Sequence, residues 1–273
     1  MKLKIHLVIS MLMVSTVLLC GCHNKTENYF DETKSNVTDD FATEKEKTAP
    51  SEHTSASFTS CSINTSQLGT FRYWLYTPSN PTKNMPLIVY LHGGSEKGDD
   101  LNKITSVDGF PKYLQSGQLK NVRAYVIIPQ LPSTQKSWEG ASEAIYDLID
   151  QTISTYKINK NNISLTGHSM GGTGTWDIAC TYPELFARIA PLSGSIHNTP
   201  YVINKLKNIS VRAFVGSADT IVSPDSSVEV VEALKAVGAD AEITEFDGAD
   251  HFSVPSLTFL DTNIDLVDWL ICG

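Results

Sequence analysis

The sequence lacks the short motifs that mark several large enzyme classes. It contains no glycine-rich dinucleotide motif, no P-loop and no His/Glu pattern of the kind that holds a metal ion. We therefore expect chemistry that needs no cofactor and no metal. Positive charge is also scarce, since 21 Lys and Arg stand against 30 Asp and Glu and give a net charge of −9. No basic stripe is left for nucleic acid or acidic phospholipid headgroups, so nucleic acid is not an expected partner.

Cysteine is rare, and its spacing indicates no metal site. Of the five cysteines, two lie near the N-terminus, and the other three are Cys61, Cys180 and Cys272. An odd number without ligand spacing argues against a zinc site. A disulfide between Cys61 and Cys272 would join the two ends of a domain, and the sequence leaves that pairing open. Cys180 lies in a helical segment and is expected to be buried.

Long apolar runs are limited to the N-terminus, where the pattern is that of a secretory signal. Lysines precede the run 7–19, which is short for a membrane span, and Leu19-Cys20-Gly21-Cys22 fits a bacterial lipobox. Residues 1–21 are predicted to be a lipoprotein signal peptide, with Cys22 as the lipidated residue. Cys20 fits less well because Leu19 precedes it, and a plain signal peptide or an uncleaved anchor is the competing interpretation. Loss of Lys2 and Lys4 with the signal would bring the net charge to −11.

The next segment, residues 22–57, is rich in Ser, Thr, Asn and charged side chains and shows no usable periodicity. Such a composition cannot bury enough apolar area to offset chain entropy, so we expect a disordered tether. A coil of about 35 residues spans roughly 30–35 Å. The sequence thus predicts a catalytic domain over residues 58–273, a monomer held at the outer face of the cell membrane.

Strand-like and helix-like segments alternate along that domain. Apolar spacing predicts strands at 71–76, 87–91 and 124–128, helices marked by Ile145 to Tyr156 and by Val228 to Val237, and a last helix over 255–270. This alternation is typical of an α/β fold with a mostly parallel sheet that carries helices on both faces. Ligands of such sheets bind at the carboxyl ends of the strands.

Ser169 is the candidate nucleophile. It lies in Gly167-His168-Ser169-Met170-Gly171, directly after an apolar stretch and directly before a helical segment. A nucleophile elbow needs this order, because a sharp strand-to-helix turn lifts the serine hydroxyl above the sheet and the glycines leave room for the crowded backbone. A glycine-rich turn with an ordinary serine would be the plainer interpretation.

The chain restricts which residues can serve as base and acid. Only two histidines follow Ser169, and no Asp or Glu occurs from residue 185 to 218. Asp219 is the first acid after the next strand, and His251 follows a later strand-like run, whereas His197 precedes every available acid. The order Ser169, Asp219, His251 is the one found in α/β-hydrolases. As alternatives for the acid, the sequence leaves Asp225, Asp247 and Asp250.

Oxyanion donors are expected in the loop after 87–91, which reads His92-Gly93-Gly94-Ser95. Backbone amides in such a loop can face a developing tetrahedral oxyanion. We assign this role to the amides of Gly94 and Met170, with Ser95 as the neighbouring choice. The side chain of His92 is expected to brace the loop.

Together these residues resemble the α/β-hydrolase superfamily. The closer resemblance is to the compact esterase branch with polyhydroxybutyrate depolymerases, feruloyl and acetylxylan esterases and prolyl-oligopeptidase-like hydrolases. The matching segments are 90–100, 128–130, 167–176, 182–186, 190–194 and Asp219. The resemblance covers roughly residues 60–272 and implies a serine hydrolase that cleaves carboxylic esters through an acyl-enzyme. A serine peptidase or amidase is the alternative reaction, and a non-catalytic binding lipoprotein on the same scaffold is the alternative class.

The substrate site is expected to be open. Only about 18 residues separate the strand that ends at Leu192 from the next one, too few for a cap domain. Trp138 and His197 are proposed to line a wide cleft, together with Asn198 and Tyr201. Such a cleft suits bulky or polysaccharide-linked esters, acetylated or feruloylated, better than long-chain triglycerides.

Overall fold

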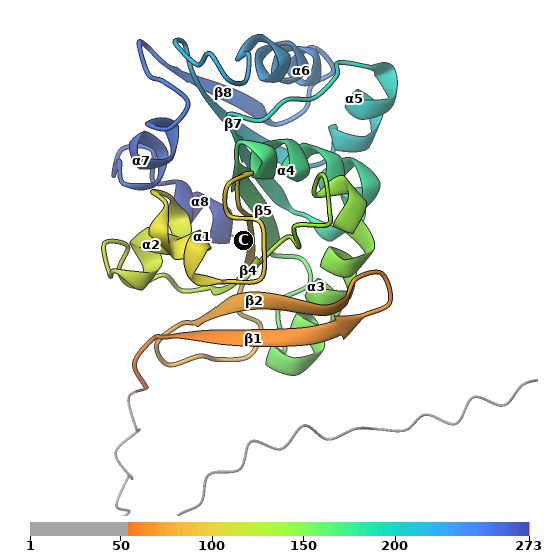
Figure 1. Ribbon diagram of the computed structural model, residues 1–273. Coiled ribbons are helices and arrows are strands. Elements are labelled where there is room, and N and C mark those ends of the chain that lie inside the picture. The colour runs from red at the N-terminus through yellow and green to blue at the C-terminus, as the bar shows by residue number, and fades with distance from the viewer. Residues whose placement is uncertain (1–53, 273) are drawn as a thin grey trace, which may run out of the picture. The chain divides into compact units, whose positions relative to one another are not determined.

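The computed structural model describes residues 54–272, and the strands in this range form a single mixed sheet (Figure 1). The strands are β1 (Ser57–Thr65), β2 (Gly69–Thr77), β3 (Leu87–Leu91), β4 (Tyr125–Pro129), β5 (Ile163–His168), β6 (Arg188–Leu192), β7 (Ser210–Gly216) and β8 (Ala241–Phe246). Their spatial order is β1-β2-β4-β3-β5-β6-β7-β8. β2 is antiparallel to both of its neighbours, and β3 to β8 pair in parallel.

The central strands are apolar throughout because helices cover both faces of the sheet. All five residues of β3 are buried, and they alternate between two hydrophobic clusters. Leu87, Val89 and Leu91 join the cluster on one face, and Ile88 and Tyr90 join the cluster on the other. This two-sided burial is why the segment reads as a continuous apolar run rather than as an alternating one.

The helices divide between the two faces, as Figure 1 shows with one group on the left and one on the right. The first cluster is covered by α3 (Ser142–Tyr156), α4 (Met170–Thr181), α5 (Pro200–Leu206) and α6 (Asp225–Ala236). The second is covered by α1 (Asn102–Ser106), α2 (Phe110–Gln115), α7 (Val254–Phe259) and α8 (Leu266–Ile271). Short 3-10 turns, η1 (Glu139–Ala141) and η2 (Pro183–Leu185), precede α3 and follow α4. The predicted doubly covered α/β-hydrolase sheet is confirmed.

Helix ends follow local chemistry. α5 begins where the Thr199 hydroxyl accepts a hydrogen bond from the Val202 amide at 3.2 Å, with Pro200 in the first turn. α3 ends at Tyr156, because the next residue, Lys157, has a left-handed φ of 55° and cannot continue the helix.

Two predicted helix limits are wrong. The expected single helix over 255–270 is two helices, because the Asp261 carboxylate accepts from the Asn263 amide at 2.8 Å and Asp265 takes a left-handed φ of 48°. Val237 was expected on the buried face of α6, but the helix ends at Ala236 and Val237 is 57% exposed.

The connection between β6 and β7 contains α5 and no cap domain. In residues 54–272 no helix is long and apolar enough to cross a bilayer, and no disulfide is formed. The predicted signal peptide, Cys22 and most of the predicted tether lie outside the described residues, while β1 begins at Ser57, one residue before the expected domain start.

Candidate active site

Ser169 occupies a strained turn between β5 and α4. Its φ of 59° and ψ of −121° lie in a region that side-chain-bearing residues rarely adopt. Strain of this kind costs on the order of 1–3 kcal/mol and persists only where the surroundings enforce it. The turn therefore has the geometry expected of a nucleophile elbow.

Close backbone packing enforces the turn. A Cβ atom at Gly167 would lie 2.5 Å from the Leu91 carbonyl oxygen, and one at Gly171 would overlap the same carbonyl. A Cβ at Gly172 would overlap the carbonyl of Leu192, the last residue of β6. Glycine at these positions lets the start of α4 rest directly on the ends of β3 and β6, which fixes the direction of the Ser169 side chain.

The structure pairs His251 with Asp219. The Nδ1 atom of His251 lies 2.6 Å from Oδ2 of Asp219, and both side chains are nearly inaccessible to solvent. Because the carboxylate can only accept, Nδ1 carries the proton and donates it. The remaining ring nitrogen, Nε2, is then free to accept a proton from a hydroxyl.

Asp219 is held as a carboxylate by its own turn. Its Oδ1 accepts from the amides of Ile221 and Val222, each at 2.9 Å. Burial raises the pKa of Asp219, but the hydrogen bonds from the Val222 amide, His251 and the Ile221 amide outweigh it, so the pKa lies below its ordinary value. The charge that orients His251 is thus present at neutral pH.

The three alternative acids have other partners. Asp250 accepts from the amides of Phe252 at 3.1 Å and Ser253 at 2.9 Å. Asp225 contacts the Ser223 hydroxyl at 3.2 Å, and Asp247 the Ser217 hydroxyl at 3.5 Å. These carboxylates therefore stabilise turns, and Asp219 is the acid bonded to the imidazole.

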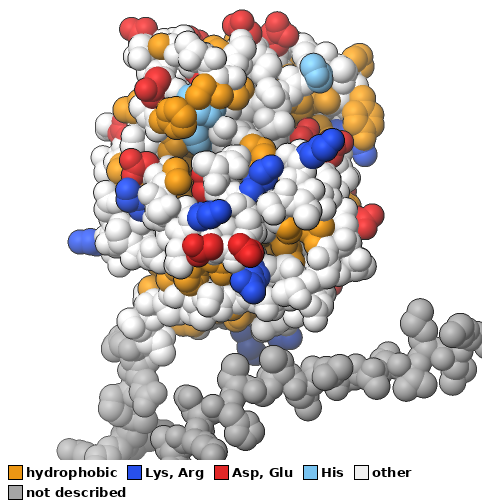
Figure 2. All heavy atoms as spheres, in the orientation of Figure 1, with side chains coloured by type: hydrophobic (Ala, Val, Ile, Leu, Met, Phe, Trp, Pro, Cys, Tyr) orange, Lys and Arg blue, Asp and Glu red, His pale blue; other side chains and the backbone are white. Residues whose placement is uncertain are grey.

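Ser169 and His251 line one pocket of about 220 Å³. The other lining residues are Gly93, Gly94, Ser95, Glu96, Val107, Asp108, His168 and Phe252. Val107 is 40% exposed and Phe252 66%, so the pocket has an apolar rim. Figure 2 shows histidine atoms reaching the surface between hydrophobic side chains in its upper left part. A pocket of this size accommodates a short acyl group.

The loop after β3 places Gly94 in the wall of this pocket, and hydrogen bonds of the His92 side chain hold the loop in place. Nε2 of His92 accepts from the Leu131 amide at 3.0 Å, and Nδ1 lies 2.6 Å from the Gly93 carbonyl oxygen. An imidazole that accepts at Nε2 and donates at Nδ1 is neutral. In agreement, burial lowers the pKa of His92 to about 4. His92 is thus a structural brace, as predicted from the sequence.

Further hydrogen bonds hold the same loop. Nε2 of Gln130 donates to the carbonyls of Glu96 at 2.9 Å and Asp100 at 2.7 Å. The Gly98 amide donates to the Leu131 carbonyl at 3.0 Å, and the Arg72 guanidinium to the Asp99 carbonyl at 2.9 Å. A loop tied at so many points can present amides without rearranging during a reaction.

Trp138 was expected to line the substrate cleft, and this prediction is wrong. The side chain is fully buried, and its Nε1 donates to the His92 carbonyl at 2.9 Å. Its Cβ also fills the space beside Gly174 of α4, where an added Cβ would lie only 2.5 Å away. Trp138 therefore connects the loop after β3 to the helix that follows Ser169.

His197 was also expected in the cleft, and the structure does not place it there. It is exposed and does not line the pocket that contains Ser169. Its neighbour is Asp177 of α4, whose pKa burial raises to about 6, with Glu139 adding to the rise and His197 opposing it. Tyr201 is likewise 63% exposed, with the Lys205 ammonium 5.7 Å from the centre of its ring. The segment after β6 therefore lies beside α4 and does not cover the nucleophile.

The structure adds His168, which sequence reasoning left without a role. It is buried beside Ser169, and its Nε2 lies 2.8 Å from the backbone carbonyl oxygen of His251. The two imidazole rings are 4.7 Å apart between centroids. Burial lowers the pKa of His168 to about 4, so it donates as a neutral ring. The sequence signal that could have indicated this role is the position of His168 directly before Ser169 in the pentapeptide 167–171.

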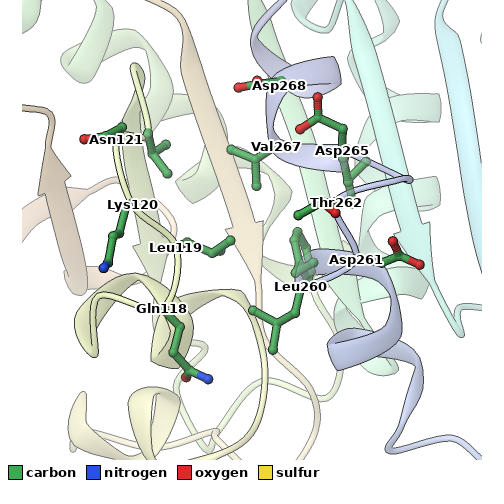
Figure 3. A pocket seen from close by; sticks show the side chains of 13 residues that line it. Gln118, Leu119, Lys120, Asn121, Leu260, Asp261, Thr262, Asp265, Val267 and Asp268 are labelled. Atoms are coloured by element: carbon green, nitrogen blue, oxygen red, sulfur yellow. The ribbon is translucent and has the colours of Figure 1, made fainter.

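A second hollow of about 230 Å³ lies elsewhere, between the segment that follows α2 and the segment that links α7 to α8. Figure 3 shows Gln118 to Asn121 on one side and Leu260 to Asp268 on the other. Asp261 there is already bonded to Asn263. In the described part of the chain no group of His, Cys, Asp and Glu is arranged to hold a metal ion. This hollow contains no nucleophile beside a base.

Comparison with known proteins agrees with this geometry. Residues 71–251 match the family described as putative esterase. The chain belongs to the putative esterase family. A probable acetylxylan esterase A from Aspergillus clavatus is 25% identical over 179 residues, which cover 59% of this chain and 53% of that protein. A poly(3-hydroxyalkanoate) depolymerase C from Paucimonas lemoignei is 28% identical over 143 residues, 46% of this chain and 32% of its own.

Solved structures are also similar to this one. A thermostable esterase superposes with a TM-score of 0.65 and 26% identity, covering 78% of this esterase-family chain and 62% of the other. The range 71–251, which matches the family, contains Ser169, Asp219 and His251. This chain matches about half of the length of the first curated relative and about a third of the second.

Proposed function

We propose that the protein is a serine hydrolase that cleaves carboxylic esters through an acyl-enzyme. The observation that carries the proposal is the 2.6 Å contact between His251 and Asp219 in a structure where His251 and the strained Ser169 line one pocket. A serine hydroxyl is a weak nucleophile near neutral pH and needs a base held in the correct tautomer. The Asp219 contact holds that tautomer.

In the proposed reaction, the Ser169 hydroxyl attacks the ester carbonyl carbon while Nε2 of His251 takes its proton. The oxyanion is bound by the amides of Gly94 and Met170, the latter at the start of α4, where the helix dipole also favours negative charge. The C–O bond to the alcohol then breaks, and His251 returns the proton to the leaving alcohol. Water, deprotonated by His251, attacks the acyl-enzyme and releases the acid and free Ser169.

The proposed substrates are short acyl esters on polysaccharide fragments. Three observations support this choice: the match to an acetylxylan esterase, the pocket of about 220 Å³, and the absence of a cap domain between β6 and β7. An uncapped site admits a bulky alcohol portion such as a sugar chain. Feruloyl esters are the second choice within this class, because the exposed rim formed by Val107 and Phe252 offers apolar contact to an aromatic ring.

The test is turnover of the purified protein on 4-nitrophenyl acetate, acetylated xylo-oligosaccharides, feruloylated arabinose esters and a matched acetanilide. We expect ester cleavage far faster than amide cleavage, and Ser169→Ala should lower kcat by about 10⁴-fold or more. Mass spectrometry of acid-quenched enzyme should find the acyl adduct on the peptide with Ser169. Ser195→Ala is the matched control, since Ser195 is an exposed serine outside the pocket. Full activity of Ser169→Ala would refute the mechanism.

We further propose that the mature protein begins at a lipidated Cys22 and acts outside the cell at the membrane surface. The support is the lipobox-like sequence Leu19-Cys20-Gly21-Cys22 after a short apolar run. Expressed in a bacterium, the full chain should fractionate with membranes, and Cys22→Ser should lose the lipid and the membrane association. An unmodified N-terminus elsewhere would contradict the proposal.

A further inference from the structure

Glu96 places a carboxylate in the wall of the catalytic pocket. Its side chain is almost fully buried, yet it lines the same hollow as Ser169 and His251. A Cβ at Gly93 would lie 3.1 Å from Oε2 of Glu96 and 3.7 Å from the Cβ of Ser169. Because both distances start from one point, the carboxylate oxygen and the nucleophile's Cβ are within about 7 Å of each other.

No cation neutralises this carboxylate within the pocket. Oε1 of Glu96 accepts from the Ser95 hydroxyl, and Oε2 lies 3.7 Å from Nδ1 of His92. His92 is neutral in this structure, since its Nε2 accepts from the Leu131 amide, so the contact is not an ion pair. The adjacent Lys97 donates to the Gln135 carbonyl at 3.3 Å.

The remaining wall carries no positive charge either. Its other carboxylate, Asp108, is 65% exposed and is paired with Lys112 at 2.7 Å, so solvent and the lysine screen it. Val107 and Phe252 are apolar, and the residues that line the pocket include no Lys or Arg. No lysine or arginine in this wall would therefore shield a negatively charged group on a bound ester from the field of Glu96.

We propose that Glu96 is a specificity-determining residue that excludes esters with a negative charge near the scissile bond and favours esters with hydrogen-bond donors there, such as the hydroxyl groups of a sugar. The inference rests on the proposed ester hydrolysis. A negative charge on a bound ester that lies at a similar distance, about 7 Å from Glu96 in a partly solvated pocket, would be repelled enough to lower transition-state stability by roughly tenfold in rate. A carboxylate that bonds a substrate hydroxyl would in addition favour polyol esters over alkyl esters.

The experiment compares kcat/KM for matched neutral and anionic esters. One pair carries the charge on the alcohol side, methyl 4-acetoxybenzoate and 4-acetoxybenzoate. The other carries it on the acyl side, 4-nitrophenyl methyl adipate and 4-nitrophenyl hydrogen adipate. For the unmodified protein we expect the neutral ester to be preferred by about tenfold or more in at least one pair. Glu96→Gln, which keeps the shape of the side chain, should reduce that preference to about twofold in the same pair.

Asp108→Asn is the matched control, because it removes a carboxylate that is exposed and paired, and we expect the preference to change by less than twofold. Thermal unfolding of each variant shows whether Glu96→Gln remains folded. If it does not, Glu96→Asp, which retains the charge on a shorter side chain, should keep the discrimination. Equal turnover of neutral and anionic esters by the unmodified protein, or an unchanged preference in folded Glu96→Gln, would overturn the inference while leaving ester hydrolysis intact. Absence of turnover on every ester would instead refute the proposed function.

Discussion

His168 holds the backbone of His251: its Nε2 lies 2.8 Å from the His251 carbonyl oxygen, and the two rings are in contact. His168, which directly precedes the nucleophile Ser169, therefore supports the loop that contains the base, His251. Since Asp219 holds the imidazole of His251 at Nδ1, the histidine is fixed by one bond on its ring and one on its main chain. Loss of either bond should affect turnover more than binding.

Replacement of His168 tests this arrangement. His168→Phe keeps an aromatic ring beside His251 but removes the hydrogen-bond donor. We expect kcat to fall about tenfold while KM changes little, because the loop that positions His251 loses one hydrogen bond of about 1 kcal/mol. His168→Gln, whose amide can reach the same carbonyl, should restore part of the loss. Steady-state kinetics on a soluble acetate ester measures both. A larger change in KM than in kcat would argue against a positioning role.

Asp219 should matter far more than its acidic neighbours. Asp219→Asn leaves the ring of His251 without the acceptor that fixes its tautomer, and kcat should fall by about 10⁴-fold by analogy with other triads. Asp250→Asn is the paired control, because the Asp250 carboxylate accepts from the amides of Phe252 and Ser253 and not from the imidazole of His251. The same kinetic assay decides between them. A severe loss in Asp250→Asn together with an active Asp219→Asn would move the acid.

Trp138 should influence activity although it never meets the substrate. Trp138→Phe preserves most of the buried ring but removes the donor to the His92 carbonyl. We expect the free energy of unfolding to fall by about 1–2 kcal/mol and kcat/KM by several-fold, because the loop with Gly94 loses a brace. Denaturant unfolding and kinetics on the same preparation provide the two numbers. Tyr146→Phe, at an exposed tyrosine, serves as the control for aromatic replacement.

Acid should begin to destabilise the folded domain at a pH above the range in which ordinary carboxylates titrate. The pKa of His92 and the pKa of His168 are both lowered to about 4 by burial, so between pH 6.5 and 4 the unfolded chain binds protons that the folded chain does not. Stability therefore falls as pH drops through this window. Asp177, with a pKa raised to about 6, takes up a proton in the folded state and opposes the trend.

Two variants separate these contributions. His168→Gln should flatten the dependence of unfolding free energy on pH between 6.5 and 4, by up to about 1.4 kcal/mol per pH unit. Asp177→Asn should make it steeper between pH 6 and 4, because the opposing proton uptake is lost. Chemical denaturation at a series of pH values measures the slopes. Identical slopes in all three proteins would contradict the assignment of these groups.

The sequence predicted the parts of the fold that local pattern controls. β3 coincides with its continuous apolar run, and β6 ends at Leu192 as predicted. The pentapeptide around Ser169 predicts the elbow because glycine spacing and the strand-to-helix order both report backbone geometry. The break before α8 was missed, since it depends on the turn of Asp261 and on the left-handed Asp265 rather than on apolar periodicity.

Roles that depend on packing between distant segments could not be read from the chain. A tryptophan after β4 is compatible with a cleft wall or with a buried brace, and only the contact of Trp138 with His92 and Gly174 distinguishes them. His197 shows the same limit, because a histidine in a short connection can face either side of the sheet. Glu96 and His168 both lie within motifs that the sequence shows. Their proposed roles depend on packing, however: Glu96 is buried in the wall of the pocket, and His168 is buried against His251.

The glycine contacts beneath Ser169 also determine which half of the site can move. With no side chain between the start of α4 and the ends of β3 and β6, the helix cannot slide over the strands without backbone atoms colliding. The nucleophile is therefore fixed to the strands by direct packing of backbone on backbone. His251, by contrast, lies within a short turn that Asp250 holds through the amides of Phe252 and Ser253, with the exposed Phe252 beside it. Any adjustment of the site to substrates of different shape should occur on the histidine side, with the serine as its fixed point.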